Sequence, residues 1–99
     1  MIVKITLNEN GQPNGKVADA ELHFSDGPLA GMKLIGFGVW KRRNHAGFNV
    51  TFPARSYSVN GERRSFALLR PAHEGYNAQD GIRDMIIATY QSVVAGVPA

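Results

Sequence analysis

The middle of the chain concentrates cations beside aromatic residues. Between Met32 and Pro71 lie eight Lys or Arg residues and one acid, Glu62, for a net charge of +7. The rest of the chain contains three cations and seven acids, for a net charge of −4. Lys and Arg neutralise phosphates and release counterions, and aromatic rings offer stacking surfaces to unpaired bases. This segregation of charge predicts an anionic partner, with nucleic acid as the first candidate.

The run KRRNHAGF (41–48) holds three adjacent cations, Lys41, Arg42 and Arg43, in what reads as a tight turn. A turn does not require neighbouring like charges, which repel one another. The run is therefore either an ordinary solvated loop or a place where a polyanion binds. We expect His45, in the same turn, to be solvated.

A second group of cations flanks Asn60-Gly61, the strongest short signal for a β-hairpin, because a type I′ turn needs positive φ at both central residues. A two-residue turn there places Tyr57 opposite Arg64, and Arg55 opposite Phe66. This face is either a nucleic-acid surface or a ladder of cation–π pairs that only stabilises the hairpin. The predicted nucleic-acid-binding residues are Lys41, Arg42, Arg43, Arg55, Tyr57, Arg63, Arg64, Phe66 and Arg70.

The elements that must position these residues follow from hydrophobic periodicity. Alternation predicts strands over 3–7, 18–24, 32–41 and 48–52, and Pro53 then interrupts the ladder or marks an edge. A helical stripe after a capping pair, Asn77 and Asp80, predicts a helix that Gly96 ends. The stripe comprises Ile82, Met85, Ile86, Thr89, Tyr90, Val93 and Val94, with Tyr90 in the core. We expect one α+β domain over 1–99, an antiparallel meander of four to five strands with one C-terminal helix.

The strand over 32–41 is apolar on both faces, with Met32, Leu34 and Trp40 against Ile35, Phe37 and Val39. One helix covers only one face of a sheet, so the other face predicts a partner chain. Trp40 fits the core or this interface better than a stacking surface. The expected interface of a strand-mediated homodimer comprises Ile35, Phe37, Val39 and Trp40.

Catalytic and metal-binding patterns are absent from the sequence. His23, His45 and His73 share no ligand spacing, and the GFG at 36–38 is one part of a dinucleotide fingerprint in the wrong context. We expect no enzyme activity, catalytic residue, metal, cofactor or small-molecule substrate. The lack of cysteine excludes disulfides, and no signal peptide or apolar run of membrane-spanning length is visible. The sequence therefore predicts a cytoplasmic protein without membrane contact.

The order of motifs resembles the stage V sporulation protein G family over about residues 15–90. GFNVTFPAR…NGERR…P is similar to that family's GLFIAMPSRK…DGEFRDIAHP, and GIRDMIIATY is similar to its KIQDAVLNEY-type helix. Pro53, Arg55, Gly61, Glu62 and Arg64 match the family pattern. The hairpin here is three residues longer, and ALLR replaces the family's DIAH. Asp80 and Gly81 stand where the family carries Arg and Lys, a departure that predicts binding through the hairpins and not through the helix start.

The resemblance implies a small bacterial homodimer with a regulatory role, which contacts DNA or RNA through basic residues, in a family related to sporulation and septation. Together with the charge pattern, it predicts a dimeric nucleic-acid-binding regulator that uses basic β-hairpins. The alternative is a protein-interaction module whose basic face docks an acidic partner protein.

Overall fold

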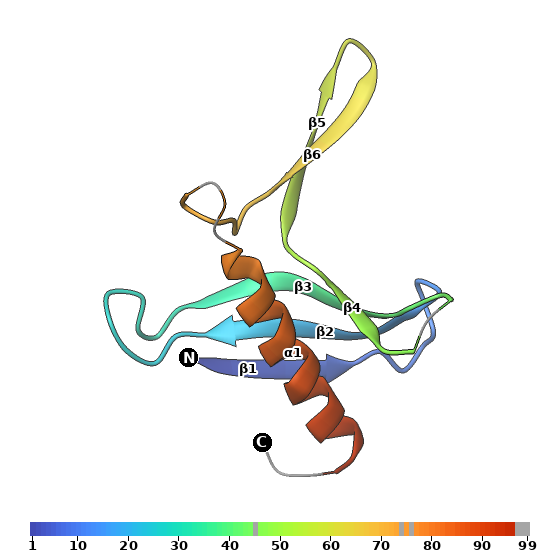
Figure 1. The fold of residues 1–99 in the computed structure, drawn as a ribbon, viewed down its shortest axis with the longest axis vertical. Coiled ribbons are helices and arrows are strands. Elements are labelled where there is room, and N and C mark those ends of the chain that lie inside the picture. Colours follow the sequence, from blue (N-terminus) through green and yellow to red (C-terminus); the bar gives the residue numbers. More distant parts are fainter. Residues whose placement is uncertain (45, 74, 76, 97–99) are drawn as a thin grey trace.

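The computed structural model describes residues 1–44, 46–73, 75 and 77–96. In these ranges the chain forms β1 (Ile2–Leu7), β2 (Lys16–His23), β3 (Lys33–Lys41), β4 (Phe48–Thr51), β5 (Ala54–Val59), β6 (Glu62–Ala67) and α1 (Ala78–Val94). Strands β1 to β4 pair antiparallel in chain order, and β5 and β6 form a second, two-stranded sheet (Figure 1). The predicted α+β fold, an antiparallel meander with one C-terminal helix, is confirmed.

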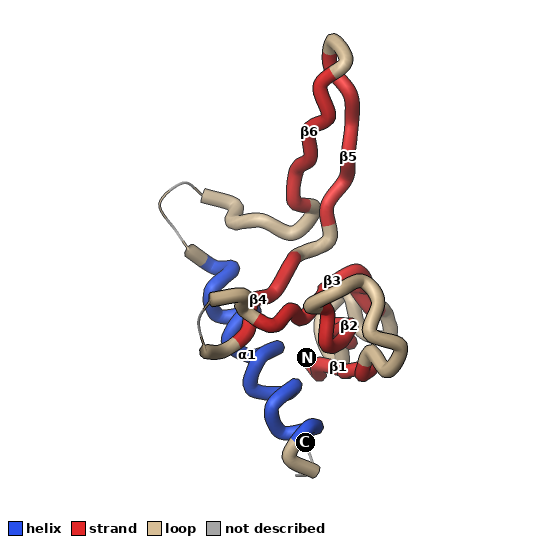
Figure 2. Tube along the Cα trace, turned by 90° about the vertical axis from the view of Figure 1, so that its right-hand side faces the viewer, coloured by secondary structure: helices blue, strands red, loops and turns tan. Residues whose placement is uncertain are grey.

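Helix α1 covers one face of the four-stranded sheet (Figure 2). Its predicted apolar stripe faces the strands, with Ile86 and Tyr90 buried, although Val94 at the end of the stripe is exposed. The Tyr90 ring packs edge-on against Phe48 of β4, with 4.9 Å between the ring centroids. On the sheet, alternate residues of β2 supply the matching surface, as the strand period requires: Ala18, Ala20 and Leu22.

The helix begins and ends where the sequence indicates. Asn77 is the N-cap residue, but its side-chain amide donates to Asp80 Oδ2 at 2.6 Å instead of its oxygen accepting from a backbone N–H. At the other end Gly96 adopts φ +74°, the left-handed conformation that commonly follows a helix. Within the described residues, no helix combines the length and apolar character that crossing a membrane requires.

A β-bulge in β3 changes the predicted faces of that strand. Ala20 pairs with Phe37 and Leu22 pairs with Leu34, so two residues of β3 lie opposite the single residue Glu21. One of the two is Gly36, whose φ of +103° is accessible mainly to glycine. The extra residue turns Leu34 to the same face as Phe37, against α1.

The expected dimer interface is wrong for two of its four residues, Phe37 and Val39. Phe37 and Val39 are 1% and 0% exposed within the single chain, beneath α1, so neither side chain is free to contact a partner. Ile35 is 58% exposed and Trp40 is half-buried, on the opposite face among polar side chains. Of the four residues expected at the dimer interface, only Ile35 and Trp40 remain on the face that α1 leaves uncovered, and the homodimer stays a prediction.

The chain leaves the sheet at Pro53. The β3–β4 ladder ends at the pair Gly38–Thr51, and Pro53 has no N–H with which to extend it. Pro53 is buried beside Gly36, where a Cβ atom would lie 3.0 Å from the proline Cβ. The next two strands, β5 and β6, project from the body as an isolated hairpin (Figure 1).

The register of the hairpin is the predicted one. Arg55 pairs with Phe66 and Tyr57 pairs with Arg64, around a turn in which Asn60 and Gly61 have φ of 51° and 80°. Every residue of β5 and β6 is exposed apart from the last, which is half-buried. The hairpin therefore presents both of its faces to solvent.

Candidate nucleic-acid interface

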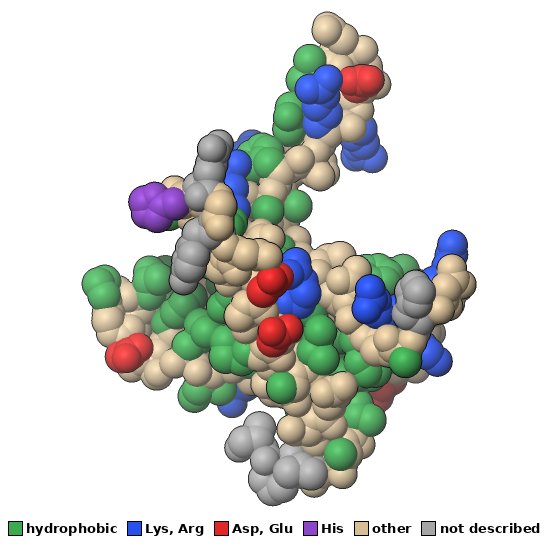
Figure 3. All heavy atoms as spheres, in the orientation of Figure 1, with side chains coloured by type: hydrophobic (Ala, Val, Ile, Leu, Met, Phe, Trp, Pro, Cys, Tyr) green, Lys and Arg blue, Asp and Glu red, His purple; other side chains and the backbone are tan. Residues whose placement is uncertain are grey.

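The predicted binding residues lie on two separate surfaces. We define the hairpin surface as Arg55, Tyr57, Arg63, Arg64, Phe66 and Arg70. We define the sheet-end surface as Trp40, Lys41, Arg42 and Arg43, where β3 runs into the turn before β4. Figure 3 shows Lys and Arg side chains gathered along the hairpin and at that end of the sheet, with acidic side chains on α1. His45 lies outside the described residues.

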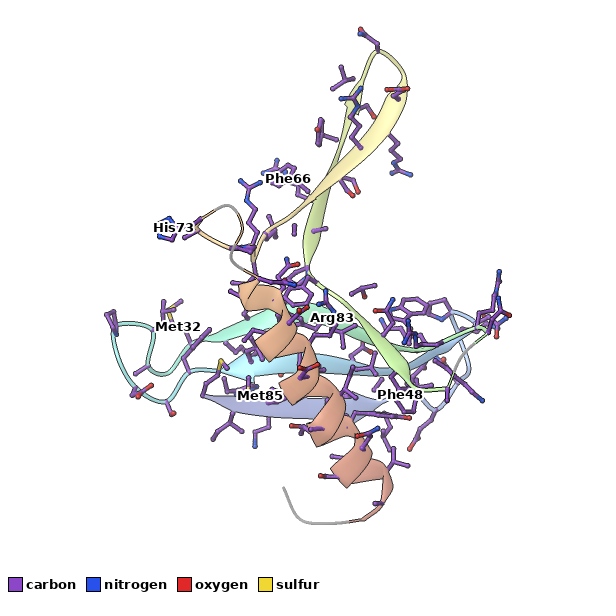
Figure 4. All side chains as sticks on the ribbon, in the orientation of Figure 1. Met32, Phe48, Phe66, His73, Arg83 and Met85 are labelled. Atoms are coloured by element: carbon purple, nitrogen blue, oxygen red, sulfur yellow. The ribbon has the colours of Figure 1, made fainter. Side chains whose placement is uncertain are left out.

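The hairpin surface combines cations with two neighbouring rings. Tyr57 and Phe66 are 42% and 39% exposed, and their ring centroids lie 5.8 Å apart. Figure 4 shows Phe66 at the side of the hairpin, away from the four-stranded sheet. The register places Arg55 and Arg64 on the same face as the rings, whereas Arg63, opposite Ser58, lies on the other face. Cations therefore lie on both faces of the hairpin.

The cation–π contact on the hairpin is not the predicted cross-strand one. The guanidinium of Arg70 lies 5.8 Å from the Phe66 ring centroid, and Arg64 forms an ion pair with Glu62 at 3.0 Å. For Arg55, the described residues contain neither a carboxylate within salt-bridge distance nor an aromatic ring in cation–π contact. A cation–π ladder that only stabilises the hairpin therefore does not account for Arg55, which makes no such contact within the described part of the chain.

At the sheet-end surface, the indole of Trp40 is held on the outer face of the sheet. Its Nε1–H donates to Thr51 Oγ1 at 2.9 Å. A Cβ atom on Gly38 would lie 2.8 Å from both of these atoms, so only glycine leaves room for the bridge. Lys16, opposite Trp40 on β2, places its Nζ 5.9 Å from the ring centroid. Trp40 is therefore not a core residue of this chain, and its predicted place in a dimer interface stays a prediction.

A hollow of about 380 Å³ lies beside the indole, lined by Asn14, Gly15, Trp40, Lys41, Arg42 and Arg43. The hydrogen bond from Lys41 N to Gly15 O, at 2.9 Å, ties the β1–β2 loop to β3. The turn after β3 is closed by a bond from Arg42 N to Gly47 O at 3.2 Å. Two separate loops thus form one concave site with an aromatic side and a basic side.

Sequence reasoning missed Asn14 and Gly15 as members of this site, because only the pairing of β2 with β3 brings their loop to the cations. Trp40 precedes Lys41 directly in the sequence, and that adjacency was an available signal for its role. Its assignment to the core or to a dimer interface followed from grouping it with Met32 and Leu34 on one apolar face, and the bulge turns Leu34 away from that face.

Two acidic groups near the outer face of the sheet, Glu21 and Asp19, pair with residues other than the cations of the sheet-end surface. Hydrogen bonding with His23, followed by that with Lys33, lowers the pKa of Glu21 below its ordinary value of 4.5. Asp19 forms an ion pair with Lys16. Among the residues that the structure describes, Lys41, Arg42 and Arg43 have no carboxylate within salt-bridge distance. Their charge is available to an external anion.

The same described ranges contain no group of three or more potential metal ligands. Comparison of the chain with known protein families, curated proteins and solved structures found no match. The resemblance to the stage V sporulation protein G family stays a prediction. At the helix start, where this chain departs from that family, Asp80 accepts a hydrogen bond from Arg83 at 2.7 Å and so pairs within the helix.

Proposed function

We propose that this protein binds nucleic acid through the hairpin surface and the sheet-end surface. The observation that carries the proposal is the pairing of unneutralised cations with accessible rings at both places. Arg55 shares a face with Tyr57 and Phe66, and Lys41, Arg42 and Arg43 adjoin Trp40. Phosphate contacts supply affinity without sequence preference, and rings add base stacking.

The proposal also includes a regulatory role, a homodimer and a cytoplasmic location. The first two come from the family resemblance, and the location from the cysteine-free composition. A dimer would double both basic surfaces and extend the track available to a polyanion. Sedimentation equilibrium would show whether the mass in solution is that of one chain or of two.

The direct test is a binding panel with single-stranded DNA, duplex DNA and RNA, measured by fluorescence anisotropy over a series of salt concentrations. We expect affinity to fall steeply with salt, with a log–log slope of roughly 0.7–0.9 per phosphate neutralised. Reversal of Arg42, Arg43 and Arg64 to Glu together is expected to abolish binding at physiological salt. Single Arg42→Glu should weaken binding more than Lys4→Glu, which makes the same charge change on β1, outside both surfaces.

Absent binding, or binding that salt does not weaken, would overturn the proposal. In that case the alternative is a module that docks an acidic partner protein through the same cations. Retention of a protein partner after nuclease treatment, together with loss of that partner in the Arg42, Arg43 and Arg64 reversal, would favour this alternative.

A further inference from the structure

The indole at the sheet-end surface is held in place before any ligand arrives. The hydrogen bond from Nε1 to Thr51 Oγ1 and the close approach of Gly38 fix one edge of the ring. On the loop side Gly15 faces the ring, because a Cβ atom added there would lie 4.0 Å from Trp40 Cε3, at ordinary van der Waals distance. A ring already fixed in this way loses little side-chain entropy when a ligand stacks on it.

The neighbours of Trp40 are polar, which is unusual for a ring that serves packing. They are Thr51 and Lys16 on the adjacent strands, Asn14 in the loop, and the three cations that follow it in sequence. The Lys16 ammonium, at 5.9 Å, is near the outer limit of about 6 Å for a cation–π contact. Lys16 also forms an ion pair with Asp19, so little free energy is lost when a stacking ligand displaces the ammonium group from the ring.

The hollow itself has the composition of a nucleotide site. Its volume of about 380 Å³ lies within the range of roughly 300–1,000 Å³ that small-ligand sites occupy. One side is the aromatic ring of Trp40, and another carries Arg42 and Arg43, whose guanidinium groups match phosphate geometry. Asn14 adds an amide that can donate to and accept from a base edge.

We propose that this hollow binds one unpaired nucleotide, with its base stacked on Trp40 and its phosphates on Arg42 and Arg43. The proposal rests on the proposed nucleic-acid binding and makes it specific. A base in a duplex has both faces covered by its neighbours, whereas a base in a single strand can be splayed out onto a ring. The site therefore selects single-stranded over duplex nucleic acid.

Trp40 is the only tryptophan of the chain, so intrinsic tryptophan fluorescence reports on this hollow alone. The experiment titrates the full protein with a single-stranded oligothymidylate and, in parallel, with a random-sequence duplex of equal length. Tryptophan emission is followed together with the anisotropy of a fluorescein label on the nucleic acid. We expect single strands to quench the emission in step with the anisotropy change, and duplexes to change anisotropy with little quenching.

Two variants test the contribution of the ring. Trp40→Leu removes the stacking surface and is expected to weaken single-strand binding by roughly 5- to 150-fold, with duplex binding nearly unchanged. Trp40→Phe keeps a smaller ring and should retain part of the affinity. Phe66→Leu, the matched loss of a ring from the hairpin surface, is expected to leave the quenching of Trp40 in place.

The outcomes separate this inference from the proposed function. Single-strand binding by anisotropy without quenching, or with affinity unchanged in Trp40→Leu, overturns the nucleotide site and leaves nucleic-acid binding standing. No anisotropy change with any nucleic acid overturns both. Equal quenching by polyglutamate at the same salt concentration also overturns the nucleotide site, because an acidic peptide supplies charge without a base.

Discussion

Phe37 in β3 and Phe66 in β6 are the same residue type in antiparallel strands, yet their side chains are 1% and 39% exposed. Phe37 lies between the four-stranded sheet and α1, where Phe52 packs edge-on against it at 5.2 Å. Phe66 has Tyr57 and Arg70 as its ring partners, and no second layer covers the hairpin in the described residues. The body of the molecule thus contains a buried apolar core, whereas no residue of β5 or β6 belongs to that core.

This difference predicts that the body determines the stability of the protein and that the hairpin contributes mainly to ligand binding. A two-stranded hairpin alone is marginally stable in water, so little of the global free energy of unfolding depends on it. The hairpin is held at its base, where Leu68 N donates to Pro53 O at 2.8 Å. Substitutions in the hairpin should therefore change ligand binding with little effect on unfolding, and substitutions in the body should change unfolding first.

The largest effect that we expect is the difference in unfolding free energy between alanine substitutions of Phe37 and of Phe66. Phe37→Ala removes a fully buried ring and is expected to lower the free energy of unfolding by about 3–5 kcal/mol. Phe66→Ala loses the cross-strand contact with Tyr57 and the cation–π contact with Arg70, each worth about 0.2–1 kcal/mol at an exposed site. Urea unfolding followed by far-ultraviolet circular dichroism measures both, and equal losses would mean that the hairpin unfolds as part of the core.

We expect an intermediate difference in unfolding free energy between alanine substitutions of Gly38 and of Gly61. Gly38→Ala inserts a methyl group 2.8 Å from Trp40 Nε1 and Thr51 Oγ1 and is expected to cost about 1–3 kcal/mol of unfolding free energy. Gly61→Ala meets no neighbour within 4 Å but must adopt φ +80°, which strains only the hairpin turn.

We therefore expect Gly61→Ala to leave global unfolding within about 0.5 kcal/mol of the parent. Amide hydrogen exchange in β5 and β6 should become faster, because the strain acts on a locally opening unit. A red-shifted tryptophan emission in Gly38→Ala alone would report the displaced indole. Unchanged emission and unchanged stability in that variant would contradict the close packing at Gly38.

The smallest effect that we expect is a pH-dependent difference in the urea midpoint between Glu21→Gln and Glu62→Gln. Because the pKa of Glu21 is lowered in the folded protein, its contribution to stability is present above the ordinary value of 4.5 and is lost as pH falls through the folded-state pKa. Glu21→Gln should therefore lower the urea midpoint slightly at neutral pH, and the difference from the parent should disappear in acid.

Glu62→Gln removes the matching carboxylate from the hairpin, where it pairs with Arg64. We expect no change in the global urea midpoint at either pH, because the hairpin contributes little to core unfolding. A larger midpoint shift for Glu62→Gln than for Glu21→Gln would reverse the ranking of the two regions.

Much of the fold could be predicted because it depends on neighbours in sequence. The Asn60-Gly61 turn determines the pairing of Tyr57 with Arg64, since a two-residue loop allows one register. The helical stripe around Ile86 and Tyr90 likewise identifies the face that packs on the sheet. Pro53 ends one ladder because it lacks an N–H, which is a property of that residue alone.

The faces of β3 could not be predicted in the same way. Strict alternation over 32–41 assigned Leu34 and Phe37 to opposite faces, but the bulge places both against α1. A glycine such as Gly36 within a strand is a signal for a bulge, but it does not fix where the register shifts. At the bulge Gly36 lies beside Pro53, which follows β4, so the shift occurs at a contact between segments distant in sequence that alternation does not report.

The sequence by itself determined the segregation of charge, the register of the hairpin and the helix that packs on the sheet, because each depends on residue type or local spacing. Only the tertiary structure decided that Trp40 leaves the apolar face and meets Asn14, Gly15 and the cations of the next turn. That meeting requires the β2–β3 ladder, which pairs Trp40 with Lys16 and so joins segments distant along the chain. Non-local pairing of this kind depends on the packing of the whole sheet.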